Sequence, residues 1–471
     1  MLRQSPRTMT NYADTIAAIS TPPGKGGVAI IRISGADAVK IGAEIFKPVS
    51  NYPFENAKPR MQVRGGIYHR GEQIDDGMAT YFKAPASYTG EDTVEIACHG
   101  GTLVTKLVLE AALLAGARAA EAGEFTRRAL INGKLSLTGA EAISSLLEAE
   151  SVEKIKLSSQ RSRSLLSNRI EEIRTELTSL LSSIYARIDY PDEDLGDYTD
   201  AQALSALRKI KGSADSLLRT YKTGRSVSEG IDTVICGKPN VGKSSIYNLL
   251  IGRDAAIVTD VEGTTRDVLS EKIPLGRVLL NLYDTAGIRK STLDPIEKIG
   301  IERSRDKIAE CELILAVFDL SRELDEEDKA LISELEDAEG TKVAILNKSD
   351  LDARLDRSAI NAAFDEQIEI SAHSGGESAL DALCALVDRL FTDEKITVGE
   401  AAIISSARQN AQLGRAIDFI DSAIGALELN LAQDVASSDV ERALGAIAEL
   451  DGRAVSEEVV NDIFAKFCVG K

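Results

Sequence analysis

The eight residues Gly-Lys-Pro-Asn-Val-Gly-Lys-Ser at 237–244 match the pattern G-x-x-x-x-G-K-S/T. They follow an apolar run at 234–236, which predicts a strand, and they precede helical spacing at 245–250. In this context the backbone N–H groups of the loop and the positive end of the helix hold phosphate oxygens, and glycines let the backbone approach them. Lys243 would then reach the β- and γ-phosphates, and Ser244 would offer its hydroxyl to Mg²⁺. The stretch predicts a nucleotide-binding α/β domain.

Three further elements follow at the ends of predicted strands, in the order expected of a guanine-nucleotide site. Asp-Thr-Ala-Gly at 284–287 places a carboxylate near the metal and a glycine N–H near the γ-phosphate. Asn-Lys-Ser-Asp at 347–350 ends another strand, and the Asp350 carboxylate would accept from the N1–H and the amine of guanine, which adenine cannot supply. Ser-Ala at 371–372 follows the next strand, where a loop would close over the base. Together these elements predict a GTP-binding domain.

The segment Thr-Asp-Val-Glu-Gly-Thr-Thr-Arg-Asp at 259–267 predicts a switch loop, because a hydroxyl there can complete the Mg²⁺ shell when γ-phosphate is bound. Thr265 is the expected second Mg²⁺ ligand beside Ser244. Ile288 stands where many small GTPases carry the glutamine that orients the attacking water. Another polar group must therefore orient the water. The candidates are Arg289, Asp294, Glu297 and Glu302, although a residue of this kind, taken alone, is more often an ordinary exposed helix charge. The residues expected to contact GTP are Asn240, Val241, Gly242, Lys243, Ser244, Ser245, Thr259, Thr264, Thr265, Asp284, Thr285, Ala286, Gly287, Asn347, Lys348, Asp350, Ser371 and Ala372.

The composition narrows the class of protein. A length of 471 residues suggests about two to four domains. The 55 Lys and Arg residues against 74 Asp and Glu give a formal charge of −19, so the chain is not basic throughout, although a local basic patch can coexist with an acidic total. An aromatic content of 4% without Trp disfavours a stacking platform for single-stranded nucleic acid, and five scattered Cys residues disfavour a disulfide framework or a structural zinc site. Because no apolar run reaches the about 18–20 residues of a membrane helix and the N-terminus lacks a secretory signal, we expect a cytoplasmic protein.

The patterning along the chain predicts a multidomain α+β protein. Apolar residues three or four apart at 170–188 and 417–427 predict amphipathic helices. Between them, short apolar runs alternate with helical segments, as in a doubly wound parallel sheet, so an α/β domain is expected to be inserted into a helical one. The expected segments are a disordered extension at 1–10, an N-terminal α+β domain at 11–130, the first part of the helical domain at 131–228, the nucleotide-binding α/β domain at 229–395 and the second part of the helical domain at 396–471.

Several shorter motifs resemble those of one GTPase family. Asn240 in the phosphate loop and Gly-Thr-Thr-Arg-Asp at 263–267 recur among several bacterial GTPases. The narrower matches are Asp-Thr-Ile at 14–16, Thr-Pro-Pro-Gly-Lys-Gly-Gly at 21–27, Tyr-Thr-Gly-Glu-Asp at 88–92, Gly-Glu-Phe-Thr-Arg-Arg-Ala at 123–129 and the terminal Cys468-Val469-Gly470-Lys471. Together they resemble the MnmE (TrmE) family of tRNA uridine modification GTPases over nearly the whole chain after the first ten residues. Val469 departs from the isoleucine that is usual in the terminal motif.

The resemblance implies a homodimer built through a folate-binding N-terminal domain, with a helical domain and an inserted GTPase domain. It implies a partnership, as a heterotetramer, with the FAD-containing protein MnmG, so that FAD belongs to the partner alone. The pair would add an aminomethyl or carboxymethylaminomethyl group to C5 of the wobble uridine (position 34) of certain tRNAs. The residues that fall on the family's site for 5-formyl-tetrahydrofolate, or a related one-carbon folate, are Arg32, Glu95, Lys134 and Lys471. Glu297 falls on its water-positioning residue and Cys468 on its modification chemistry.

Asn240 suggests how hydrolysis is accelerated without an arginine. Its side-chain carbonyl would lie beside the phosphates, and a switch loop crossing there could add backbone carbonyls from Thr259, Val261 and Thr264. Oxygen ligands of this kind suit a monovalent cation, and the resemblance points to K⁺. The alternative is that Asn240 is only a turn residue of the loop.

Other interpretations stay open at this point. Arg32 lies in an apolar strand and could be a structural ion-pair partner, and Cys468 lies four from the end like a lipidation signal, which Lys471 disfavours. The whole chain could be a regulatory switch, such as a ribosome-assembly GTPase, or a one-carbon enzyme with a vestigial GTPase domain. The folate-like N-terminal domain and the Cys468 tail favour a modification enzyme over a pure switch, and the full set of GTP elements argues against a vestigial domain.

Overall fold

The computed structural model describes residues 14–50, 52–189, 199–252, 270–283, 310–431, 433–454, 456–465, 467 and 469–470. The chain divides into two compact units, Met1–Ser144 with Ala448–Lys471, and Ser145–Ile447. The C-terminal residues thus belong to the same unit as the N-terminal sheet, because Phe464 and Phe467 are buried against Ala140. The expected division into five segments stays a prediction.

A seven-stranded sheet forms the centre of the first unit, with the strand order β3-β4-β5-β6-β2-β1-β7. Neighbouring strands are antiparallel except for β1 and β7, which are parallel. The strands are β1 (Ile16–Ile19), β2 (Val28–Ser34), β3 (Phe46–Pro48), β4 (Gln62–His69), β5 (Glu72–Phe82), β6 (Thr93–His99) and β7 (Arg118–Ala119).

The two faces of this sheet have different chemistry because side chains alternate along a strand. On β2, Ala29, Ile31 and Ile33 are buried in a core with α1 (Ala38–Ile45) and α2 (Thr102–Leu114). Arg32 lies between them in sequence and therefore points to the opposite face. That face carries a smaller apolar cluster of Ile16, Ala18, Ala120 and Phe125, the last from α3 (Glu124–Ile131). The remaining helices with residues in this unit are α4 (Leu137–Leu147), the last turn of α15 and α16 (Glu457–Ala465).

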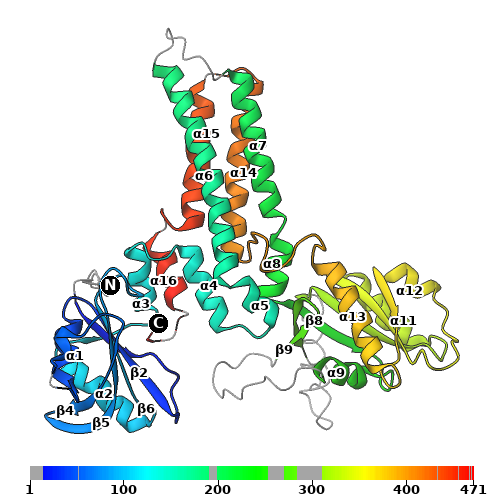
Figure 1. The fold of residues 1–471 in the computed structure, drawn as a ribbon. Coiled ribbons are helices and arrows are strands. Elements are labelled where there is room, and N and C mark those ends of the chain that lie inside the picture. Colours follow the sequence, from blue (N-terminus) through cyan, green and yellow to red (C-terminus); the bar gives the residue numbers. More distant parts are fainter. Residues whose placement is uncertain are drawn as a thin grey trace, which may run out of the picture. The chain divides into compact units, whose positions relative to one another are not determined.

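Long helices form one part of the second unit, where α6, α7, α14 and α15 lie side by side (Figure 1). Two of them begin at capping boxes, Thr199 with Gln202 for α7 and Ser406 with Gln409 for α14. Their buried apolar residues recur every three or four positions, as the sequence predicts. The helices of this part are α5 (Val152–Leu157), α6 (Gln160–Asp189), α7 (Asp200–Leu218), α8 (Tyr221–Ser228), α14 (Ala407–Glu428) and α15 (Gln433–Asp451).

A six-stranded sheet forms the other part of the second unit, with the order β13-β12-β11-β8-β10-β9. All neighbouring strands are parallel except β9 and β10. The strands are β8 (Ile231–Gly237), β9 (Ser270–Leu275), β10 (Val278–Tyr283), β11 (Leu313–Asp319), β12 (Thr341–Asn347) and β13 (Glu366–Glu369). The helices are α9 (Lys243–Ile251), α11 (Glu326–Glu336), α12 (Ser358–Ala363) and α13 (Gly376–Phe391).

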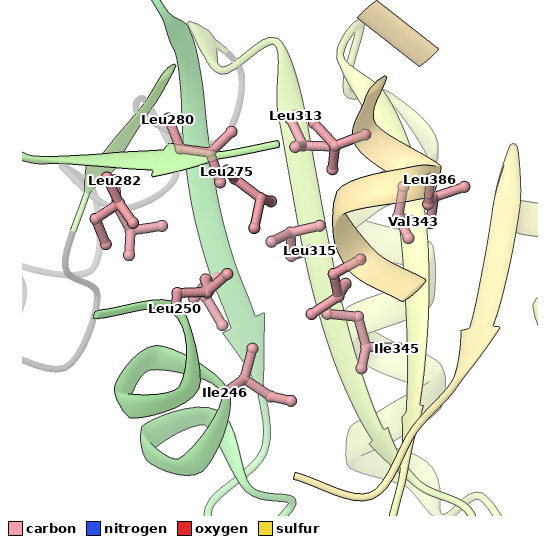
Figure 2. Close-up of a cluster of buried hydrophobic side chains, with 14 of the residues drawn as sticks. Ile246, Leu250, Leu275, Leu280, Leu282, Leu313, Leu315, Val343, Ile345 and Leu386 are labelled. Atoms are coloured by element: carbon pink, nitrogen blue, oxygen red, sulfur yellow. The ribbon is translucent and has the colours of Figure 1, made fainter. Parts of the chain in front are cut away.

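Helices cover both faces of this sheet. Figure 2 shows one face, where Ile246 and Leu250 of α9 and Leu386 of α13 meet leucine, isoleucine and valine side chains of the strands. On the other face Phe318 packs with residues of α11 and α12, among them Leu335 and Ile360. Apolar residues on both sides of a strand are typical of a buried parallel sheet.

The expected fold class is confirmed: an N-terminal α+β part, an α-helical part, and an α/β part whose sequence lies between α8 and α14. Within the described residues, no helix combines the length and the apolar character needed to cross a membrane.

Candidate functional site

The phosphate loop connects β8 to α9. At two of its positions the backbone leaves room only for glycine. Gly237 and Gly242 have φ of +139° and +105°, which side chains rarely adopt. A Cβ on Gly237 would lie 2.5 Å from the Val317 carbonyl oxygen, and one on Gly242 would lie 2.1 Å from Nδ2 of Asn347. Asn240, between them, also has a positive φ of 65°. The glycine spacing of the motif therefore has a direct steric cause.

The side chains at the start of α9 are arranged as an anion site requires. The Lys243 ammonium donates to the carbonyl oxygens of Gly237 at 2.8 Å and Lys238 at 2.6 Å, so it lies over the loop. Ser244 and Ser245 are exposed in the first turn of the helix. Backbone N–H groups, an ammonium and hydroxyls thus converge where a helix N-terminus favours negative charge.

Asn347 joins this loop to the region of the expected base site. It is the last residue of β12 and is buried, with 3% of its surface exposed. Its Nδ2 donates to the Val241 carbonyl at 2.8 Å, and its Oδ1 accepts from the Ala372 N–H at 3.0 Å. One amide therefore fixes the loop after β8 against the segment that follows β13, across the carboxyl edge of the sheet.

Two carboxylates lie beside it. Lys348 has a φ of 64°, and its ammonium donates to the Asp319 carboxylate at 2.6 Å. Burial raises the pKa of Asp319, but the hydrogen bonds from Lys348 and Ser321 outweigh the effect of burial. The pKa of Asp319 is therefore lowered. Asp350 is exposed, and the Ser371 hydroxyl is the first cause of its lowered pKa. An ionised carboxylate at Asp350 is the acceptor that guanine recognition needs.

The remaining residues predicted for GTP and its metals fall outside the described residues. These are Thr259, Val261, Thr264, Thr265, Asp284, Thr285, Ala286, Gly287 and Glu297. The carboxyl end of β10 at Tyr283 immediately precedes Asp284, so this chain segment leaves the sheet at the same edge as the phosphate loop. Ligands bind at this edge in open α/β sheets.

A second group of predicted residues lies on the open face of the N-terminal sheet. Arg32 and Glu95 are paired across β2 and β6 and form an ion pair at 2.8 Å, with 19% and 25% of their side chains exposed. The guanidinium carbon of Arg32 lies 5.4 Å from the ring centre of Tyr88 and 5.6 Å from that of Phe125. Aromatic faces on a guanidinium stabilise it and fix its plane. Arg32 is thus a structural ion-pair partner whose guanidinium is partly exposed.

Lys134 lies beside residues 88–92, the segment that contains Tyr88. No hydrogen bond or ion pair joins Lys134 to Arg32 or Glu95 among the described residues. Its ammonium donates to the Pro85 carbonyl at 2.9 Å, and its Cγ would lie 3.2 Å from a Cβ on Gly90. The neighbouring Asn132 donates to the Thr89 carbonyl at 2.7 Å. The structure brings the segment that carries Lys134 against residues 88–92.

A buried arginine holds the motifs of this unit together. Arg128 is 1% exposed, and its guanidinium contacts Asp14 at 2.8 Å, Glu91 at 3.2 Å and Glu124 at 3.0 Å. These carboxylates come from three motifs that lie far apart in the sequence. Removing one partner of such a network leaves a buried charge uncompensated.

The C-terminal tail docks on this unit. Val469 forms an isolated β-bridge with Ala122, and the Ser20 hydroxyl donates to the Gly470 carbonyl at 3.0 Å. Gly470 has a φ of +99°, and a Cβ there would lie 2.1 Å from the Ile19 carbonyl oxygen. Cys468 and Lys471 lie outside the described residues.

Comparison with known proteins identifies the family of the chain. A model described as "GTP-binding protein TrmE N-terminus" matches residues 15–134, and one described as "MnmE helical domain" matches residues 137–468. The tRNA modification GTPase MnmE of Thermotoga sp. (strain RQ2) is 38% identical over 463 residues, which cover 97% of this chain and 100% of that protein. This chain belongs to the MnmE family.

Further members and a solved structure were also found. The tRNA modification GTPase MnmE of Clostridioides difficile (strain 630) is 36% identical over 458 residues, covering 97% of this chain and 99% of that MnmE. A crystal structure of a GTP-binding protein from Sulfolobus solfataricus in complex with GDP is 15% identical, covers 51% of this chain and 71% of its own, and has a TM-score of 0.24.

The described part of this MnmE-family chain contains Cys98, Cys236, Cys311 and Cys384, and none of them forms a disulfide there. Cys98 and Cys236 are buried thiols. Burial raises the pKa of Cys236 to about 12 and that of Cys98 to about 11, so neither forms a thiolate at neutral pH. A reactive thiol in the described residues would need a more open and more positive environment.

Sequence reasoning missed two groups that the structure places at the sites. Asp319 pairs with Lys348, and Arg128 joins the three motifs around Asp14, Glu91 and Glu124. The sequence does carry a signal for Asp319, because it ends an apolar strand of the α/β domain. In such sheets ligands bind at the carboxyl ends of the strands. For Arg128, only the pair with Glu124 has a local signal, the i,i+4 spacing on a helix, whereas Asp14 and Glu91 lie 114 and 37 residues away.

One further cluster could ligate a metal on geometry alone. Asp75, Asp76 and His99 have ligand atoms within 4.8 Å of one another, and two of the three residues are exposed. His99 Nδ1 lies 2.7 Å from Asp75, and its backbone N–H donates to the same carboxylate at 2.8 Å. The imidazole–carboxylate pair of His99 and Asp75 explains the arrangement of this cluster.

Proposed function

We propose that this chain is a GTP-hydrolysing tRNA modification enzyme. The observation that carries the proposal is the Asn347 amide, which joins the Val241 carbonyl to the Ala372 N–H and so assembles the phosphate loop and the base-site loop in one place. Relatives named tRNA modification GTPase MnmE support it, because they match 97% of the chain. A GTPase activity in tRNA modification is thus what both the family and the geometry favour.

Each described residue of the site has a role in holding GTP. Lys243 would exchange its loop carbonyls for the β- and γ-phosphates, since an ammonium gains more from an anion than from neutral oxygens. Ser244 would hold Mg²⁺ together with Thr265, and the ion, when bound, neutralises charge on the phosphates. Asp350 would accept from the guanine ring and amine, while Ser371 and Ala372 border the base.

We also assign the acceleration of hydrolysis to K⁺ and Glu297. Asn240 has a left-handed backbone conformation, with a φ of 65°, which is uncommon for a residue other than glycine. Its side-chain oxygen, with backbone carbonyls of Thr259, Val261 and Thr264, would form the K⁺ site. Glu297 would position the attacking water, because Ile288 offers no polar group.

The face around Arg32 is proposed to bind a one-carbon folate such as 5-formyl-tetrahydrofolate. A carboxylate such as Glu95 suits the donor groups of a pterin, and cations suit the two carboxylates of the folate tail. Arg32 and Glu95 are paired and partly exposed, Tyr88 and Phe125 supply aromatic faces, and Lys134 lies beside the same motif. Lys471 would complete the set.

The modification itself is proposed to need a partner. A homodimer of this chain would act with the FAD-containing protein MnmG, as a heterotetramer, to place an aminomethyl or carboxymethylaminomethyl group on C5 of the wobble uridine. Cys468 would contribute to that chemistry from the tail that Val469 and Gly470 dock on the N-terminal unit.

Phosphate release by the purified protein tests the proposal. We expect hydrolysis of GTP but not of ATP, and much faster turnover in KCl than in NaCl at equal ionic strength, because a cavity of fixed oxygens selects by ion size. Equal rates in the two salts would remove the K⁺ site, and equal use of ATP would remove the guanine assignment. For the folate, Arg32→Gln should weaken binding in a titration without changing GTP turnover.

A further inference from the structure

A positively charged hollow in the second unit is lined by residues other than those assigned above. It has a volume of about 460 Å³ and is formed by the end of α7, the start of α8, the end of α13 and the segment that follows α13. Four cationic side chains line it, Arg219, Lys222, Arg389 and Lys395, with Asp393 and Glu394 at the same surface. Four cations against two carboxylates make its lining positive, although the whole chain carries a charge of −19.

Three of the four cations lack a carboxylate partner among the described residues. Arg389 is paired with Glu366 at 2.8 Å, whereas Arg219, Lys222 and Lys395 form no ion pair with a carboxylate among the described residues. The Lys222 ammonium lies 5.8 Å from the ring centre of Phe391 instead. Cations that outnumber the carboxylates around them repel one another, and a bound anion relieves that repulsion.

The carboxylate next to this cluster is already engaged by the backbone. Asp393 accepts the Lys395 backbone N–H at 2.9 Å, and its own N–H donates to the Thr223 hydroxyl at 2.9 Å. The segment is therefore held in one conformation, which fixes Lys395 beside the helix ends that carry Arg219 and Lys222. A set of cations on fixed backbone is suited to a ligand with several anionic groups.

The other described hollows do not share this character. The one beside Asp350 is lined by carboxylates and hydroxyls without a cation, and the one around Ala17 has two lysines in a mainly apolar wall. An RNA approaching a strongly acidic protein is repelled overall, so its contact must fall where cations are not neutralised. Arginine binds phosphate through two parallel hydrogen bonds, and lysine binds it as a point charge.

We propose that the hollow formed by Arg219, Lys222, Arg389 and Lys395 binds the phosphodiester backbone of the tRNA substrate. The proposal rests on the proposed function, which supplies the tRNA. It assigns these residues to sequence-independent anchoring, because phosphate contacts position a nucleic acid without reading its bases.

The test compares two triple variants that remove the same charge. In one, Arg219→Gln, Lys222→Gln and Lys395→Gln empty the hollow of its unpaired cations. In the control, Lys40→Gln, Lys58→Gln and Arg354→Gln remove three exposed cations that do not line the hollow and form no ion pair with a described residue. Binding of an unmodified tRNA transcript is measured by fluorescence anisotropy from about 50 to 200 mM salt, the range over which phosphate contacts dominate.

We expect the hollow variant to bind tRNA at least about tenfold more weakly, with a slope of log K against log salt shallower by about 2–3, since each lost phosphate contact removes about 0.7–0.9. The control variant should keep the wild-type slope. GTP turnover without tRNA should be unchanged in both variants, which shows that they are folded. Inorganic phosphate at equal anion concentration should compete far less than RNA.

Five results would overturn the proposal. Unchanged tRNA binding by the hollow variant, or an equal loss in the control, would show that the hollow holds no RNA. Competition by inorganic phosphate as strong as that of RNA would make it a small-anion site. Loss of binding to the FAD-containing partner with tRNA binding intact would make it a protein-docking site. If the wild-type protein hydrolyses GTP but binds no tRNA, the proposed function fails first and this inference fails with it.

Discussion

Replacing Asn347 with alanine would separate the two halves of the GTP site. The side chain is buried, and its amide satisfies the carbonyl of Val241 at 2.8 Å and the N–H of Ala372 at 3.0 Å. Alanine removes both partners and leaves two polar groups without hydrogen bonds. Because the loop after β8 and the loop after β13 are then no longer tied, we expect the loss to appear mainly in nucleotide affinity.

The magnitude follows from the burial of the two orphaned groups. Leaving one buried polar group unsatisfied costs about 1–3 kcal/mol. Val241 is fully buried and takes the upper part of that range, whereas Ala372 is half-buried and takes the lower part. A total of about 2–4 kcal/mol corresponds to GTP binding about 30- to 1000-fold weaker.

The assay is a titration with a fluorescent GDP or GTP analogue in the presence of Mg²⁺. Asn347→Asp is a second variant, which keeps the acceptor for Ala372 but places a carboxylate against the Val241 carbonyl, and it should bind no better than the alanine variant. Asn361→Ala, an exposed asparagine on α12, is the control and should bind like the wild type. If Asn347→Ala binds nucleotide within twofold of the wild type while remaining folded, the amide does not assemble the site.

Three other changes have definite expected outcomes. Lys243→Ala should abolish tight GTP binding because the triphosphate loses its main cation, and retained affinity in the same titration would refute the phosphate-loop assignment. Asp350→Asn should weaken GTP and improve binding of xanthosine triphosphate, whose oxo group prefers an amide donor; equal GTP affinity would show that Asp350 does not contact the base. The hydrogen bond to Asp75 raises the pKa of His99, so its contribution to stability is present below the usual histidine pKa and is lost as pH rises through the raised value. An NMR titration should show that raised pKa and its return to about 6.5 in Asp75→Asn; an unshifted pKa in the wild type would contradict the pair.

Much of the GTP site is predictable from the sequence because it is built from local segments at strand ends. The loop at 237–244 needs glycine where φ is positive, and the runs at 231–237 and 341–347 are apolar enough to be strands of a buried sheet. Residues that end these strands then lie at the same edge of the sheet, because parallel strands bring their carboxyl ends together. Asn347 and Asp350 are therefore predictable from the sequence as residues at the carboxyl edge of this sheet.

Long-range pairing could not be predicted in the same way. Arg128 contacts Asp14, which lies 114 residues away in the sequence, and Lys348 contacts Asp319, which lies 29 residues away. Neither separation corresponds to the repeat of a helix or a strand, so the sequence pattern does not indicate the contact. The placement of residues 448–471 with the N-terminal unit depends likewise on Phe464 and Phe467 finding Ala140. Such contacts arise from packing between elements, which residue patterns along a single segment do not encode.

Nucleoside analysis of tRNA from cells that lack this gene tests the central claim most directly. The account predicts that the C5-modified wobble uridine is lost on deletion, that the wild-type gene restores it, and that a gene carrying Lys243→Ala does not, because modification depends on GTP bound at the phosphate loop. An unchanged wobble uridine in the deletion strain would contradict the assignment of this chain to tRNA modification, and full restoration by the Lys243→Ala gene would contradict its dependence on GTP.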